Sequence, residues 1–222
     1  MPPVYPRASE GTPSFTQIAL LAKKYFYHEK FSMKKRSQTL ILGSASPRRK
    51  KILESLDIDF TVWAPETDEI HEAADPLHTV VFNAREKFLA CRAQHPEAAI
   101  ITADTLVWLE GRLIGKPADL EEAAAFLRSF SGRTQIVFTA VALGRPGEAE
   151  PEMRVEASSV TFKKLSEETI SEYLERTRPL DRAGAYDIDE NGELLIDHIC
   201  GSYTNIMGLP EAVVRDWVGA GK

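Results

Sequence analysis

The chain has 222 residues, of which 43% are hydrophobic and 27% charged, a balance typical of a globular protein with a sizeable core. Its net charge of −6 at pH 7 excludes an overall positive field that would attract a nucleic-acid polymer, so any phosphate ligand must be bound by local cations. No stretch approaches the roughly 18 consecutive apolar residues of a membrane span, so we expect a soluble protein without a membrane partner.

Residues 1–36 are interpreted as an N-terminal extension, either disordered or the product of an upstream start, and residues 37–222 as one domain. Four prolines fall early in the extension, and Met33 is a second plausible start. The apolar run at 18–26 contains two lysines and lacks a small-residue cleavage site, so it does not predict a secretory signal. We assign the extension no function.

The most informative stretch is 39–49, where an apolar run ends in a glycine and passes into two serines, a proline and two arginines. It predicts a buried strand, a tight turn and a helix that begins at the proline, with Ser46 as N-cap. The free N–H groups of that helix end, the hydroxyls of Ser44 and Ser46, and the guanidiniums of Arg48 and Arg49 would then meet. Such a place favours a phosphate. The alternative is a capped helix with two solvated arginines.

The pattern that follows predicts helices alternating with strands, and then a ribbon. Helices are expected at 49–56, 76–94, 120–130, 166–176 and 208–218. Strands are expected at 39–42, 60–63, 98–103, 106–109, 134–143, 154–163 and 193–199, with 134–143 and 154–163 as an antiparallel ribbon. Loops or turns are expected at 183–190 and 201–205. This order favours one α/β domain with a mixed sheet.

Carboxylates stand at two places in this pattern. Asp104 interrupts the apolar run between 98–103 and 106–109, where a carboxylate buried without a partner would be costly. It is interpreted as a general base that orients water or as a metal ligand, and the alternative is an aspartate that caps a strand end. Glu66, Asp68 and Glu69 form either a solvated acidic loop or part of a metal–phosphate site, for which Glu66 and Glu69 are favoured.

Other polar residues are less specific. Lys87 and Lys116, taken singly, are either solvated lysines or phosphate ligands. The five histidines show no metal-type spacing, so no zinc chemistry is expected. The two serines of the turn lack a nucleophile-elbow motif, which leaves phosphate binding or capping as their role. Two cysteines, Cys91 and Cys200, are too few for a disulfide framework, and a reducing cytosol is the expected compartment.

Taken together, these motifs resemble the Maf-type nucleoside triphosphate pyrophosphatases over almost everything from residue 39 onward. No single piece is specific, but their order and spacing are a strong signal. The matching pieces are Ser-Ala-Ser-Pro-Arg-Arg at 44–49, Pro-Glu and Asp-Glu within 65–69, Ala-Arg-Glu-Lys at 84–87, Ala-Asp-Thr at 103–105, Gly-Lys-Pro at 115–117, Ser-Gly at 131–132, Ala-Gly-Ala-Tyr at 183–186, Gly-Ser-Tyr at 201–203 and Gly-Leu-Pro at 208–210.

The resemblance implies an elongated α/β fold like that of the inosine triphosphatases, in which two lobes flank a nucleotide cleft. It also implies a cytoplasmic homodimer that uses a divalent metal, Mg²⁺ with Mn²⁺ or Co²⁺ as alternatives, to hydrolyse a nucleoside triphosphate to a monophosphate and pyrophosphate. Asp104 would be the proton acceptor, and cations would stabilise the departing pyrophosphate. The expected substrate-binding residues are Ser44, Ser46, Arg48, Arg49, Lys87 and Lys116, and the expected metal ligands are Glu66, Glu69 and Asp104. The rival hypothesis is a nucleotide-binding regulator of cell division or septum formation with little turnover.

Base preference is where the sequence departs from the family. In the branch that prefers dTTP and UTP, specificity is associated with the positions of Arg48 and Thr105, which match, and with a glutamine at the position of Asp189. An amide both donates and accepts hydrogen bonds, whereas an ionised carboxylate only accepts. We therefore expect activity on dTTP and UTP, with CTP or a modified pyrimidine nucleotide as competing substrates. The alternative is that Asp189 is a solvated loop residue with no part in base selection.

Overall fold

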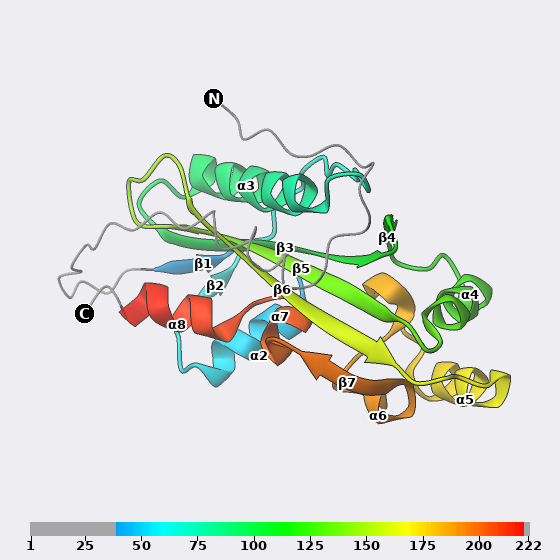
Figure 1. Ribbon diagram of the computed structural model, residues 1–222. Helices are drawn as coiled ribbons and strands as arrows, with labels where there is room; N and C mark the ends of the chain where they lie inside the picture. The colour runs from blue at the N-terminus through cyan, green and yellow to red at the C-terminus, as the bar shows by residue number, and fades with distance from the viewer. Residues whose placement is uncertain (1–38, 220–222) are drawn as a thin grey trace.

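The computed structural model describes residues 39–219, so the N-terminal extension and its boundary lie outside the described residues. Its centre is a mixed seven-stranded sheet in which β4 pairs with β3 and the other strands follow the order β2-β1-β3-β5-β6-β7 (Figure 1). The strands are β1 (Leu40–Leu42), β2 (Thr61–Val62), β3 (Ala99–Leu109), β4 (Arg112–Ile114), β5 (Thr134–Gly144), β6 (Glu152–Phe162) and β7 (Ile196–Cys200). β1 runs parallel to β2 and β3, and the remaining pairs are antiparallel.

The helices cover both faces at one end of the sheet and cluster at the other end, which makes the molecule elongated (Figure 1). They are α2 (Pro47–Ser55), α3 (Pro76–Gln94), α4 (Leu120–Phe130), α5 (Glu167–Thr177), the 3-10 turn η1 (Ala183–Ala185), α6 (Gly192–Leu195), α7 (Tyr203–Ile206) and α8 (Glu211–Gly219). This confirms the expected elongated, mixed α/β architecture. No helix within residues 39–219 has the length and apolar character needed to cross a bilayer.

Three apolar clusters hold the helices against the sheet. Strand β3 contributes side chains to clusters on both faces of the sheet. Successive residues of a strand face opposite sides of the sheet. Ile100 accordingly packs with Phe88 of α3, whereas Ile101 packs with Leu53 of α2 and with residues of α8. The third cluster fills the far end, where Phe130 of α4 is fully buried. The sheet is therefore covered on both faces near β1, and the site residues lie on a rigid support.

Two expectations about strands were wrong. Asp104 does not interrupt β3, because its side chain and that of Thr105 find polar partners on opposite faces of the strand. The strand expected at 193–199 begins only at Ile196, because residues before it form the short helix α6. An apolar run of that length does not by itself distinguish a strand from a buried helical turn.

The turn expected at 201–205 contains α7, which Ser202 caps by accepting a hydrogen bond from the N–H of Asn205. By contrast, the start of α2 matches the expectation. Ser46 is its N-cap, Pro47 occupies the first turn, and the cap accepts from the N–H of Arg49 at 3.5 Å. The start of this helix could thus be predicted from its capping serine and the proline that follows.

Candidate active site

A cavity of about 520 Å³ lies beside β3, where the sheet opens along one edge. Along the edge of β3 opposite β5, the strand pairs with β1 only through residues 99–101 and with β4 only through residues 107–109. Residues 102–106 therefore have no strand partner on this side within the described chain. The turn after β1, the loop at 64–69, α3, the segment 181–188 and residues 206–208 wall the opening. A crevice at the carboxyl end of a parallel strand is where open α/β sheets commonly bind ligands.

The turn after β1 forms one wall of this cavity. The Ser44 hydroxyl accepts from the N–H of Ser46 at 3.3 Å and from Nη1 of Arg49 at 2.9 Å. These contacts keep the first turn of α2 open toward the cavity. The N–H groups of Ser46 and Arg49 are bonded to the hydroxyls of Ser44 and Ser46, respectively, and Pro47 has no N–H. The Arg48 N–H and the positive end of the helix dipole are therefore what this turn offers to an anion.

The Arg49 guanidinium is held by three hydrogen bonds. Its Nε donates to the Gly208 carbonyl at 2.8 Å, and its two terminal nitrogens donate to the hydroxyls of Ser44 and Thr105 at 2.9 and 3.0 Å. All three acceptors are neutral, and no carboxylate among residues 39–219 forms an ion pair with this guanidinium. Burial lowers the pKa of Arg49, against the opposing effect of Asp104. A partly buried, uncompensated cation favours an anionic ligand.

Lys87 of α3 links two carboxylates. Its Nζ lies 2.7 Å from Asp104 Oδ1 and 2.7 Å from Glu69 Oε1, and Asn83 Nδ2 donates to Asp104 Oδ2 at 3.3 Å. Asn83 and Lys87 lie four residues apart, so both reach β3 from the same helix face. Asn83 also exchanges two hydrogen bonds with the backbone of Ile70, which fixes the acidic loop against α3.

The pKa of Glu69 reflects this arrangement. Desolvation raises it, but the hydrogen bond and charge of Lys87 outweigh that effect, so the net pKa is lowered. The contact between Glu69 and Lys87 therefore stabilises the fold above the carboxyl's unfolded pKa, and this contribution is lost as the pH falls through the lowered pKa.

Two arginines and an aspartate lie at another part of the cavity wall. Asp187 Oδ2 accepts from Arg182 Nε at 2.6 Å and lies 3.7 Å from Arg48 Nη1. Lys116 is exposed and also lines the cavity, just after Gly115, whose carbonyl accepts from the N–H of Gly184. Five cations, namely Arg48, Arg49, Lys87, Lys116 and Arg182, therefore line this opening.

The expected metal ligands do not form a three-carboxylate cluster. Glu66 is exposed and does not line the cavity, and Lys87 lies between Glu69 and Asp104. Among the described residues, no three His, Cys, Asp or Glu side chains are grouped as a metal site. Glu69 and Asp104 nevertheless suit Mg²⁺, which commonly uses one or two carboxylates together with substrate phosphates.

The chain is most similar to known proteins over the part that builds this site. Residues 39–220 match the family described as Maf-like protein. The chain belongs to this Maf-like family. A relative named dTTP/UTP pyrophosphatase from Akkermansia muciniphila is 42% identical over 179 residues, which cover 80% of this chain and 92% of that protein. Another of the same name from Myxococcus xanthus is 45% identical over 172 residues, 77% of this chain and 86% of that protein.

A solved structure that is similar is the nucleoside-triphosphatase / dITP/XTP pyrophosphatase from Mycobacterium abscessus. The identity is 17% and the TM-score 0.37, over 58% of this chain and 76% of that one. That likeness is too distant to bear on the site.

The site residues predicted from the sequence line this cavity with two exceptions. The cavity is lined by Ser44, Ser46, Arg48, Arg49, Glu69, Lys87, Asp104, Thr105 and Lys116. Glu66 and Asp189 are not among its lining residues. Asp189 instead accepts from the Tyr203 hydroxyl and lies 3.2 Å from Lys51 Nζ, so its carboxylate joins the 186–190 segment to α2 and α7.

Sequence reasoning missed three polar contributors, namely Asn83, Arg182 and Asp187. Asn83 was visible as an amide in the middle of an apolar helix face, where an unpaired polar group would be costly. Arg182 and Asp187 flank the Ala-Gly-Ala-Tyr motif, but nothing local in the sequence shows that they turn toward α2.

Gly208 makes the Arg49 site possible. Its φ of +103° is unfavourable for a side chain, and an added Cβ would lie 3.2 Å from Thr105 Oγ1 and 3.4 Å from Arg49 Nε. We predict that Gly208→Ala lowers the free energy of unfolding by about 1–3 kcal/mol and reduces kcat/KM. Denaturant titration and steady-state kinetics check this. Gly219→Ala is the matched control, because its Cβ would meet nothing within 4 Å. Equal stability of the two variants would contradict the prediction.

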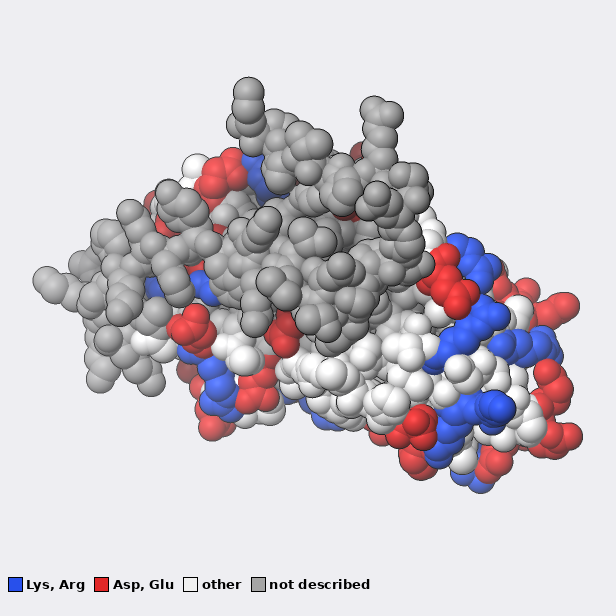
Figure 2. Space-filling model, viewed as in Figure 1, with Lys and Arg blue, Asp and Glu red and all other residues white. Residues whose placement is uncertain are grey.

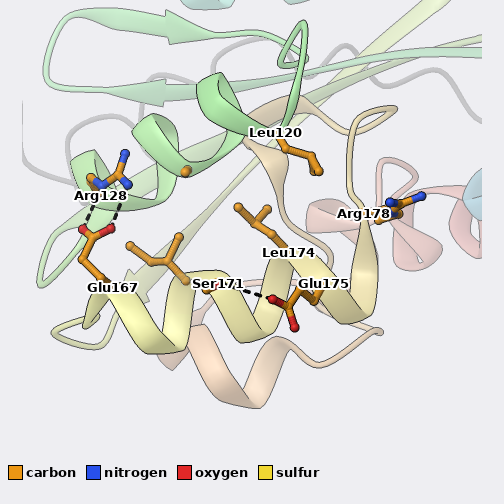
Figure 3. A pocket seen from close by; sticks show the side chains of 9 residues that line it. Leu120, Arg128, Glu167, Ser171, Leu174, Glu175 and Arg178 are labelled. Atoms are coloured by element: carbon orange, nitrogen blue, oxygen red, sulfur yellow. Dashed lines mark hydrogen bonds and ion pairs between the residues drawn. The ribbon is translucent and has the colours of Figure 1, made fainter.

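A second hollow, of about 610 Å³, lies between α4 and α5 (Figure 3). Leu120 and Leu174 contribute apolar surface, and Arg128 at its rim is paired with Glu167 through two hydrogen bonds of 2.7 and 2.8 Å. None of the sequence-predicted site residues lines it. On the face shown in Figure 2, acidic and basic side chains are intermixed over this end of the molecule.

Proposed function

We propose that this protein is a nucleoside triphosphate pyrophosphatase that hydrolyses dTTP and UTP to the monophosphate and pyrophosphate, and so removes unwanted nucleotides from the pool. The observation that carries the proposal is a single cavity in which an uncompensated Arg49 faces the paired Lys87 and Asp104. The printed names of the Maf-like relatives support the same reaction and substrates. A regulator with little turnover is not favoured, because such a protein would not need this constellation of groups.

The mechanism follows from where charge develops. Asp104 accepts a proton from water as that water attacks the α phosphate, and Asn83 and Lys87 hold the carboxylate in place. Arg49, Lys87 and Lys116 stabilise the negative charge that grows on the departing pyrophosphate. Ser44, Ser46 and the first turn of α2 supply hydrogen-bond donors for the phosphate oxygens. When bound, a divalent metal held by Glu69 and Asp104 would neutralise phosphate charge; Mg²⁺ is the proposed ion, with Mn²⁺ and Co²⁺ as alternatives.

We also propose that the protein acts in the cytoplasm, where nucleotide pools are held, and that it forms a homodimer. Both are consequences of the family resemblance. Sedimentation of the purified chain tests the second, and a single species with the mass of one chain would contradict it.

The proposed reaction is tested by measuring pyrophosphate and orthophosphate release from dTTP, UTP, CTP, ATP and GTP in the presence of Mg²⁺. We expect pyrophosphate from dTTP and UTP at the highest kcat/KM, and no orthophosphate. Nucleotide binding without release of pyrophosphate from any of the five would overturn the enzyme proposal in favour of the regulator.

A further inference from the structure

The carboxylate of Asp187 is placed between two guanidiniums inside the cavity. Its side chain is only 4% exposed, yet Asp187, Arg48 and Arg182 all line the opening. Oδ2 accepts from Arg182 Nε at 2.6 Å, and Oδ1 accepts from the N–H of Asp189 at 2.7 Å. The N–H of Asp187 itself donates to the Tyr173 hydroxyl at 2.8 Å. The carboxylate is thus held from several sides, and its orientation is fixed by the fold.

These contacts leave hydrogen-bonding capacity on each of the three groups. An ionised carboxylate has about four acceptor sites, of which two are filled by the bonds from Arg182 and Asp189. At 3.7 Å, Arg48 Nη1 makes an ion pair with Asp187 but no hydrogen bond. Among residues 39–219 no hydrogen bond of the Arg48 guanidinium is found. Arg182 bonds Asp181 and Glu190 through Nη1 and Nη2 at 3.0 and 3.2 Å, which leaves one N–H on each nitrogen.

The Asp187 carboxylate thus offers an acceptor next to two guanidinium donors, with Arg182 Nε at 2.6 Å and Arg48 Nη1 at 3.7 Å from the same oxygen, Oδ2. The edge of uracil or thymine has the complementary groups, with the O2 carbonyl, the N3–H and the O4 carbonyl. Cytosine has an acceptor at N3 and an amino group at C4, so it would place an acceptor against the carboxylate and a donor against a guanidinium. A site with fixed polar groups discriminates strongly against a ligand that leaves them unpaired.

Arg48 and Arg49 are also arranged to serve two different parts of one ligand. Consecutive helical residues point about 100° apart. Arg49 accordingly reaches the Gly208 carbonyl, whereas Arg48 reaches toward Asp187. The first turn of α2 can thus contact phosphate with one guanidinium and a base with the other.

We propose that Arg48, Asp187 and Arg182 form the site that reads the pyrimidine edge, and that Asp187 is the residue that sets the preference for uracil and thymine over cytosine. This inference rests on the proposed function and adds to it the residues that select the base. It keeps Arg48 from the specificity residues expected from the sequence, which were Arg48, Thr105 and Asp189, and puts Asp187 in place of Asp189. The carboxylate of Asp189 is engaged with Tyr203 and Lys51 and does not line the cavity.

The test compares UTP, CTP and 3-methyl-UTP, which lacks the N3–H, in the wild type and in Asp187→Asn. In the wild type we expect kcat/KM for UTP to exceed that for the other two at least about tenfold. In Asp187→Asn the ratio of UTP to CTP should fall at least about tenfold, because the amide can donate to the cytosine N3, whereas 3-methyl-UTP gains no hydrogen bond and its ratio should change less. A ratio measured within one preparation does not depend on the folded fraction, so partial unfolding cannot produce this result.

Two further variants guard against a folding failure and separate the two aspartates. Arg48→Met removes a donor at a side chain that is 33% exposed, and the ratio of UTP to CTP should fall. Asp189→Asn removes the same charge two residues away and should leave that ratio unchanged. Wild-type ratios in both Asp187→Asn and Arg48→Met, or a change confined to Asp189→Asn, would overturn the inference.

Calorimetric binding of α,β-imido analogues of UTP and CTP separates this inference from the proposed function. The expected result is a UTP-analogue preference in the wild type that Asp187→Asn loses, even in a protein that releases no pyrophosphate. Equal affinity of the wild type for the two analogues would overturn the base-reading site while leaving the reaction itself standing.

Discussion

Replacement of Asp104 by Asn should lower kcat by about 10² to 10⁴ while leaving nucleotide affinity within about tenfold. The amide keeps the shape of the carboxylate but cannot accept a proton from water. Lys87 retains Glu69 as an ion-pair partner at 2.7 Å, so the cation should stay in place. Steady-state kinetics and equilibrium binding of a slowly hydrolysed UTP analogue measure the two quantities.

Glu69→Gln is the matched control for Asp104→Asn. It neutralises the other carboxylate on Lys87, but the side chain is partly exposed and has no proposed role in proton transfer. Its loss in kcat should be much smaller at saturating Mg²⁺. A near-normal kcat for Asp104→Asn would remove Asp104 from the chemistry.

Arg49→Ala should reduce kcat/KM by at least about 10², because its charge acts on the phosphates in the ground state and more strongly as pyrophosphate departs. It should also lower the free energy of unfolding by about 1–3 kcal/mol, since the Gly208 carbonyl and two hydroxyls lose their donor. In a protein of this size that corresponds to a fall in Tm of a few degrees. Kinetics and thermal denaturation test the two parts.

Lys116→Ala should separate the loss of activity from the loss of stability, which are expected together in Arg49→Ala. Lys116 is exposed and no hydrogen bond or ion pair of its side chain is found in the described part of the chain, so the variant should lose kcat/KM with an unchanged Tm. Unchanged kinetics in both the Arg49 and the Lys116 variants would show that the triphosphate binds elsewhere.

Much of the fold and of the site was predictable because it depends on local chemistry. A serine before a proline and two arginines determines the start of α2, and an aspartate before Pro76 caps α3 by accepting from the N–H of His78. The alternation of helices and strands gave the mixed sheet. The cations and Asp104 were found from motifs whose joint order is specific to the Maf-like family.

The remainder depends on long-range geometry. The ion pair between Arg48 and Asp187 joins residues 139 positions apart in the chain, and the contact of Arg49 with Gly208 joins residues 159 positions apart. Sequence spacing carries no information about such distances. Counting along the chain from the Ala-Gly-Ala-Tyr motif led to Asp189, because it could not show which of two nearby aspartates turns toward the cavity.

The central claim is that water attacks the α phosphate of a pyrimidine nucleoside triphosphate at the Asp104 site. Hydrolysis of UTP in ¹⁸O-labelled water, followed by mass spectrometry of the products, tests it most directly. The account predicts one ¹⁸O atom in the uridine monophosphate and none in the pyrophosphate. Label in pyrophosphate or in orthophosphate would mean attack at another phosphorus atom and would contradict the account.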